Sequence, residues 1–113
     1  MSSTDRKLIG KLGEDFAVGI LYSEGYDILE RNYRKAHGEI DIICEKNGSL
    51  TFVEVKTRRS LDMGRPAESV TPRKLGRMRG AAEYYLAARR MDPAECRFLV
   101  MEILVGEVEA DGF

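Results

Sequence analysis

The sequence predicts a single α/β domain in which helices pack around one sheet. Three observations lead to this prediction: apolar residues at helical spacing near 8–20 and 75–86, strand-like runs between 26 and 56, and an apolar run at 98–105. The length of 113 residues fits one domain, and a hydrophobic content of 43% is enough to build a core. The expected order is helix, three strands, helix, and one or two strands.

The first helix is expected to begin at Ser3-Thr4-Asp5, which can cap it, and to end at Gly25. Its apolar stripe consists of residues that recur at helical spacing: Leu8, Ile9, Leu12, Phe16 and Ile20. A strand from Tyr26 to Tyr33 is expected to follow.

The next two runs predict a hairpin around Asn47-Gly48, the strongest short-range signal for a two-residue turn. With this turn, paired residue numbers sum to 95, so Asp41 lies opposite Glu54, and Glu39 lies opposite Lys56. Strand side chains alternate between faces, so these four residues are expected to share one face. The other face is then an apolar core face formed by Ile40, Ile42, Val53 and Val55.

The second half of the chain predicts a loop, a helix and a strand. The loop is expected from Thr57 to Val70, and Thr71-Pro72 is a good helix opening because a capping hydroxyl precedes a proline. This helix should run to about Arg90 with an inward face of Leu75, Met78, Ala82, Tyr85 and Leu86. A strand from Phe98 to Val105 follows, and a short one is expected at 107–109.

The expected hairpin brings carboxylates together where they can bind a metal ion. Asp41 facing Glu54 is repulsive by itself, and a divalent cation removes that repulsion because hard cations take oxygen ligands. The site therefore suits Mg²⁺ or Mn²⁺. Lys56, two residues after Glu54, can orient an attacking water or stabilise a phosphoryl transition state. The alternative is a plain surface charge ladder, in which Glu39 and Lys56 form a cross-strand ion pair.

Glu14 is a fourth candidate, because it lies at the edge of the first apolar stripe and can lean over the sheet toward the hairpin. The alternative is a solvated helix charge paired with Lys11. His37 is the only histidine, and a lone loop histidine is not expected to be a ligand or a base.

Charge is distributed unevenly, although the net charge is only −1. Eight basic residues and two acids lie between Lys56 and Arg79, whereas the chain from Asp92 onward is acidic. This asymmetry favours a basic, nucleic-acid-binding surface beside the hairpin, with a solvated helix face as the alternative.

Cysteine usage and hydropathy indicate a protein of a reducing compartment. Cys44 and Cys96 are isolated in apolar runs and are expected to be buried thiols. No run reaches the length of a membrane span, and no signal-peptide pattern opens the chain. A cytoplasmic protein without membrane contact is expected.

Five blocks in order resemble the YraN family of uncharacterised bacterial proteins, over about residues 8–104. They are Gly13-Glu14-Asp15-Phe16-Ala17, Arg31-Asn32-Tyr33-Arg34, Gly38-Glu39-Ile40-Asp41-Ile42-Ile43, Phe52-Val53-Glu54-Val55-Lys56-Thr57-Arg58, and Val70 with Lys74. The resemblance implies an endonuclease-like protein of the restriction-endonuclease-like superfamily, which includes archaeal Holliday-junction resolvases. It therefore implies the PD-(D/E)XK fold, a mixed central sheet flanked by helices in the order α-β-β-β-α-β(-β).

The superfamily pattern assigns catalytic roles to four residues by resemblance: Glu14, Asp41, Glu54 and Lys56. Arg58 and Lys74 match family positions, and basic residues there are expected to contact phosphate without reading sequence. The expected nucleic-acid-binding residues are Arg58, Arg59, Lys74 and Arg77. One departure is Leu99, where relatives typically carry an aspartate; it either removes support for the site or extends the core. The other is an acidic segment from Glu107 onward.

The sequence thus favours a Mg²⁺- or Mn²⁺-dependent endonuclease that acts on DNA rather than RNA, with structured or branched DNA as a candidate substrate. An accessory protein that binds nucleic acid with little or no cleavage is the alternative, and a purely structural domain is the third reading. A homodimer would suit a two-fold junction, but no apolar surface stripe in the sequence demands one.

Overall fold

The computed structural model describes residues 3–35, 38–59, 71–92 and 95–106. Its elements are α1 (Ser3–Ser23), β1 (Asp27–Lys35), β2 (Gly38–Lys46), β3 (Ser49–Arg59), α2 (Pro72–Arg89) and β4 (Cys96–Val105). The predicted order of helix, three strands, helix and strand is confirmed. His37 and the predicted strand at 107–109 lie outside the described residues.

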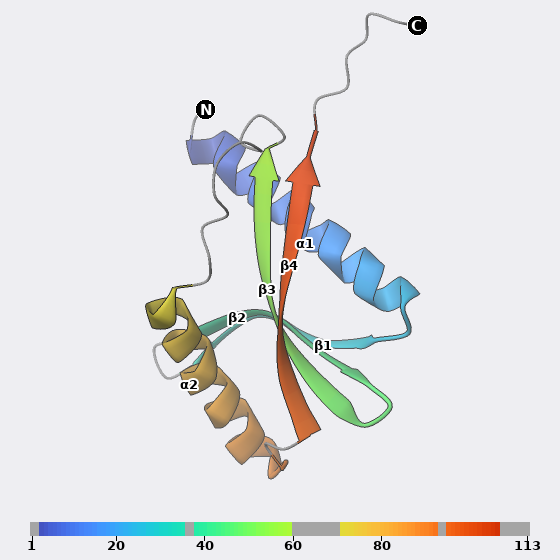
Figure 1. Cartoon of the computed structure of the whole chain (residues 1–113), viewed down its shortest axis with the longest axis vertical. Helices are drawn as coiled ribbons and strands as arrows, with labels where there is room; N and C mark the ends of the chain where they lie inside the picture. The colour runs from blue at the N-terminus through green and yellow to red at the C-terminus, as the bar shows by residue number, and fades with distance from the viewer. Residues whose placement is uncertain (1–2, 36–37, 60–70, 93–94, 107–113) are drawn as a thin grey trace, which may run out of the picture.

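The four strands form one mixed sheet in the order β1-β2-β3-β4. β1, β2 and β3 are antiparallel neighbours, whereas β4 runs parallel to β3. Parallel neighbours need a long crossover connection, and α2 lies within it. Figure 1 shows β3 and β4 side by side, with α1 across one end of the pair and α2 beside the other half.

The β2–β3 hairpin has the predicted register. The pairs run from Lys46–Ser49 to Ile42–Val53, as expected for a turn at Asn47-Gly48. Asn47 has φ 52° and Gly48 has φ 80°. Two positive φ angles are what a type I′ turn requires, and its twist matches that of the flanking strands.

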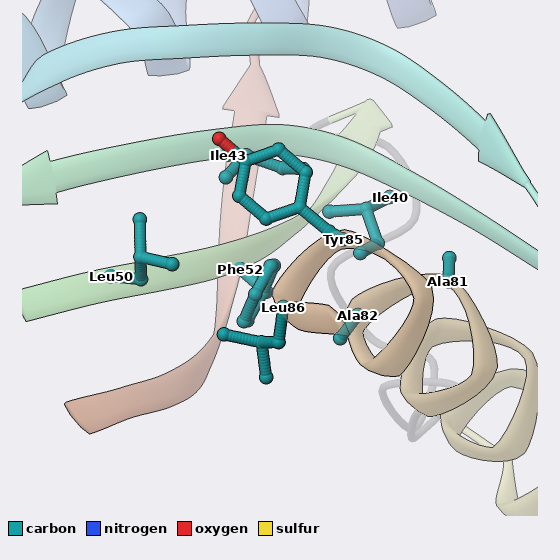
Figure 2. Close-up of a cluster of buried hydrophobic side chains, with 8 residues drawn as sticks. All are labelled: Ile40, Ile43, Leu50, Phe52, Ala81, Ala82, Tyr85 and Leu86. Atoms are coloured by element: carbon teal, nitrogen blue, oxygen red, sulfur yellow. The ribbon is translucent and has the colours of Figure 1, made fainter. Parts of the chain in front are cut away.

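The prediction of one apolar and one polar face is wrong, because both faces of the sheet are covered. The α2-side cluster contains the buried residues Ile40, Ile43, Leu50, Phe52, Ala81, Ala82, Tyr85 and Leu86 (Figure 2). The α1-side cluster contains Ala17, Leu21, Ile42, Cys44, Val53 and Ile103.

Ile40 and Ile42 therefore lie in different clusters, not on one face. Their partners on β1 are Tyr33 and Arg31, which flank Asn32. Asn32 has a positive φ of 52°, a conformation outside the β region, so regular alternation does not hold at this point.

α1 contacts the sheet through small residues, and this was not predicted. A Cβ atom added to Gly13 would lie 1.9 Å from Thr57 Oγ1, so only glycine permits this approach. Ala17 and Leu21 continue the buried line. Most of the expected stripe is exposed instead: Leu8 56%, Leu12 60% and Phe16 61%. An apolar surface stripe is thus present, contrary to the sequence interpretation.

α2 follows the prediction closely. Thr71 caps it by accepting a hydrogen bond from the Lys74 backbone N–H at 3.2 Å, and Pro72 is its first residue. The expected inward residues are buried except Leu75, which is exposed. The loop before it begins later than predicted, because β3 pairs with β4 as far as Arg59–Val105.

Cys44 is buried as expected, whereas Cys96 is only half-buried, and the two cysteines do not form a disulfide. Neither α1 nor α2 combines the length and the apolar character that spanning a membrane would require.

Candidate functional site

Asp41 lies where β2 and β3 separate. The β2–β3 pairing ends at Ile42–Val53, and beyond this pair the Val55 backbone N–H donates a 2.7 Å hydrogen bond to Asp41 Oδ2. The carboxylate thus takes a place that a backbone carbonyl would hold in a regular sheet. Because β2 and β3 are no longer paired at Glu39 and Lys56, these residues do not face each other in the sheet as expected. Glu39 Oε1 lies 3.4 Å from Arg34 Nη2 of β1 instead.

Two cavities meet at this separation, one on each side of the sheet. The α1-side cavity has a volume of about 530 Å³ and the α2-side cavity about 150 Å³. Asp41 and Glu39 line both cavities. The α1-side lining includes Glu14, Asn32, Arg58 and Arg59, and the α2-side lining includes Glu54, Lys74 and Arg77. The predicted site residues therefore come from both sides of the sheet, not from one face.

Glu14 is held in place by two residues of β1. Its Oε1 accepts hydrogen bonds from Arg31 Nη2 at 3.1 Å and from Asn32 Nδ2 at 3.0 Å, and its side chain is only 15% exposed. Arg31 Nη2 also lies 2.6 Å from Asp15 Oδ1. The alternative of a solvated Glu14 paired with Lys11 is wrong. Sequence reasoning missed both positioning residues, although they lie in one of the resembling blocks.

The pKa of the Asp41 carboxyl is raised from 3.8 to about 7. The largest cause is burial, which disfavours the charged form. Glu54 raises it further by its charge and by a hydrogen bond with Asp41, and the charge of Glu14 adds to this. The Val55 N–H acts in the opposite direction because it stabilises the carboxylate. The charged form of Asp41 is therefore disfavoured in this site, and a cation bound to the carboxylate would stabilise it.

This shift predicts how stability depends on pH. Between 3.8 and about 7 the folded state holds a proton that the unfolded chain has lost, so raising the pH through this window lowers the free energy of unfolding. With EDTA present, we expect the wild type to lose stability from pH 5 to pH 8 relative to Asp41→Asn. The asparagine does not titrate and can still accept the Val55 hydrogen bond. Urea unfolding at several pH values measures the difference, and identical pH dependence of the two proteins would contradict it.

The remaining predicted residues lie along β3 and α2. Lys74 Nζ is 3.1 Å from Glu54 Oε1. Lys56 follows Glu54 on the same face of β3 and is paired with Glu102 in the β4 register. Arg58 Nε lies 3.1 Å from Glu102 Oε1, so the charge of Arg58 is already partly compensated within the protein.

The carboxylates fit some metal ions better than others. Among the described residues, no three side chains of histidine, cysteine, aspartate or glutamate converge as a ready-made metal site. Magnesium is usually bound by one or two carboxylates, with waters and substrate phosphate completing its shell. Asp41 and Glu54 supply such a pair, so the residues fit Mg²⁺ or the similar Mn²⁺.

Leu99, which was expected to depart from the family pattern, lies beside Val53 in the β3–β4 register and packs against the α1-side cluster. In this chain the position extends the core.

Comparison with known proteins assigns the family. A family profile described as "Uncharacterised protein family UPF0102" matches residues 13–103. A UPF0102 protein of Dictyoglomus turgidum is 50% identical over 107 residues, covering 92% of this chain and 91% of the relative. One of Chlorobium phaeobacteroides is 44% identical over 109 residues, covering 96% and 86%. The chain therefore belongs to the UPF0102 family, the YraN family that its motifs resemble.

Proposed function

We propose that this protein is a Mg²⁺- or Mn²⁺-dependent endonuclease that hydrolyses phosphodiester bonds in DNA. The observation that carries the proposal is the position of Asp41. It lies between two cavities, with Glu14 in one and Glu54 in the other. Buried, mutually repelling carboxylates destabilise a protein unless a cation joins them.

The order of the elements and of the acidic residues on them supports a PD-(D/E)XK fold. An acid on the first helix, an aspartate on the second strand and a Glu-x-Lys on the third occupy the order that the superfamily pattern requires, and the sheet is mixed with helices on both faces.

Each residue has a role that its position allows. Asp41 and Glu54 would hold the metal ion, which when bound polarises the phosphate and activates water. Lys56, farther along the same face as Glu54, would orient the attacking water or stabilise the developing charge. Glu14, fixed by Arg31 and Asn32, would complete the site from the α1 side.

Basic side chains on both sides of the acids would hold the DNA backbone. Arg58 and Arg59 line the α1-side cavity, and Lys74 and Arg77 line the α2-side cavity. Contacts of this kind bind phosphates without specifying sequence. DNA binding should therefore weaken steeply as the salt concentration rises.

A cleavage assay on a panel of substrates tests the proposal. We expect metal-dependent cutting of at least one DNA in Mn²⁺ or Mg²⁺, with none in EDTA. The panel contains single-stranded, duplex, flapped and four-way-junction DNA, with RNA for comparison. Absence of cutting on every substrate would refute the endonuclease. Retained DNA binding would then favour the accessory binding protein, whose basic surface would be the same.

A further inference from the structure

Lys74 brings its ammonium group to a carboxylate that the metal ion would need. Its Nζ lies 3.1 Å from Glu54 Oε1, and the Glu54 side chain is only 13% exposed, whereas that of Lys74 is 54% exposed. Both residues line the α2-side cavity together with Asp41. A monovalent cation from the protein therefore lies beside the proposed metal ligands.

The first turn of α2 is an unfavourable position for this lysine. The N-terminus of a helix carries partial positive charge, which favours acids and disfavours cations. The first turn of α2 contains no acid, and Arg73 precedes Lys74. The helix cap uses the backbone N–H of Lys74, which Thr71 accepts, so it does not require the lysine side chain. Within the described residues, the carboxylate that compensates the ammonium is Glu54.

We infer that the Lys74 ammonium group neutralises Glu54 while the metal ion is absent, and that it moves to a substrate phosphate when the metal ion binds. This inference rests on the proposed function. A divalent ion on Asp41 and Glu54 repels the ammonium and competes for the same carboxylate. A phosphate oxygen in the cavity offers the ammonium a new partner. Metal binding without DNA must break the Lys74–Glu54 ion pair without replacing it. When DNA is present, a contact between Lys74 and phosphate replaces the lost ion pair. The two ligands are therefore positively coupled, and such coupling is reciprocal.

The test measures metal and DNA binding separately in Lys74→Met. Titration of the DNA-free protein with Mn²⁺ should show about threefold to fivefold tighter binding than the wild type, because a partly exposed competing ion pair is lost. Fluorescence anisotropy with a labelled 20-nucleotide single-stranded DNA in saturating Ca²⁺, a hard cation that takes the same oxygen ligands, should show weaker binding, because one phosphate contact is lost. These opposite signs are the signature, since a damaged fold would weaken both.

Two matched variants sharpen the result. Lys74→Arg keeps a cation at the site and should stay close to the wild type in both measurements. Arg73→Met removes a neighbouring charge from the same turn of α2 and should leave Mn²⁺ affinity nearly unchanged.

Three results would overturn the inference. Unchanged or weaker Mn²⁺ binding by Lys74→Met would mean that the lysine does not compete with the metal. Unchanged DNA binding would exclude its transfer to phosphate. An equal gain in Mn²⁺ affinity in Arg73→Met would mean that the effect comes from the overall positive charge near the site and not from the Lys74–Glu54 ion pair. Failure of the proposed function would be recognised differently, because the wild type would then cleave none of the substrates.

Discussion

Asp41→Asn should abolish metal-dependent cleavage while leaving the protein folded. The asparagine keeps the shape of the side chain and an oxygen for the Val55 N–H, but it removes the charge that would hold the metal ion. If the bound metal supplies about 4 kcal/mol of transition-state stabilisation, its loss lowers the cleavage rate at least about a thousandfold. Glu54→Gln should cause a loss of the same order. Single-turnover cleavage of the best substrate in Mn²⁺ measures both.

Glu45→Gln is the matched control for these variants. Glu45 is a carboxylate on the same strand as Asp41, beside Leu50 near the turn of the hairpin and remote from the separation of β2 and β3. Its cleavage rate should equal that of the wild type. A rate for Asp41→Asn within tenfold of the wild type would mean that Asp41 is not a metal ligand.

Gly38→Ala should strongly destabilise the protein. A Cβ atom at this position would lie 2.0 Å from the backbone oxygen of Arg77 and 3.0 Å from the backbone nitrogen of Ala81. Backbone atoms cannot rotate aside, so β2 and α2 must move apart. Overpacking typically costs about 1–3 kcal/mol, and a clash with backbone atoms should place Gly38→Ala at the upper end of this range. Urea unfolding measures the loss, and reduced DNA binding should accompany it because α2 carries Lys74 and Arg77.

Gly76→Ala tests whether this effect is specific to the β2–α2 contact. Gly76 lies in the same helix, and a Cβ atom there would meet nothing within 4 Å. Alanine is a better helix former, so this variant should be about 0.5–1 kcal/mol more stable than the wild type. Destabilisation by Gly76→Ala, or a neutral Gly38→Ala, would show that α2 docks differently.

The sequence predicts the parts of the fold that depend on local patterns. The Asn47-Gly48 turn determines the hairpin register, and Thr71-Pro72 marks the start of α2, because turn and cap signals lie in a few adjacent residues. The orientation of α1 was not predictable in this way. Large apolar residues suggested the wrong inward face, because the helix docks where Gly13 permits close approach to Thr57 and where Ala17 is buried.

The candidate site was predictable in composition but not in geometry. Residue types and spacing identified Asp41 and Glu54, whereas alternation placed every site residue on one face. Regular alternation does not hold beside Asn32, and β2 and β3 separate beyond Ile42–Val53. The pairing of Glu14 with Arg31 and of Lys74 with Glu54 joins residues 17 and 20 positions apart. Such contacts depend on how helices dock, which local patterns do not record.

The backbone and the hydrogen bond of Asn32 together restrict which residues can occupy this position. Its left-handed backbone tolerates glycine or asparagine but disfavours β-branched residues. Glycine lacks the amide that donates to Glu14, and aspartate would place a second negative charge against that acid. Selection on backbone shape and selection on the acid's orientation therefore converge on one residue type. A strong preference for asparagine among relatives would arise here without any contact between Asn32 and a substrate, so invariance at this position would not identify a catalytic group.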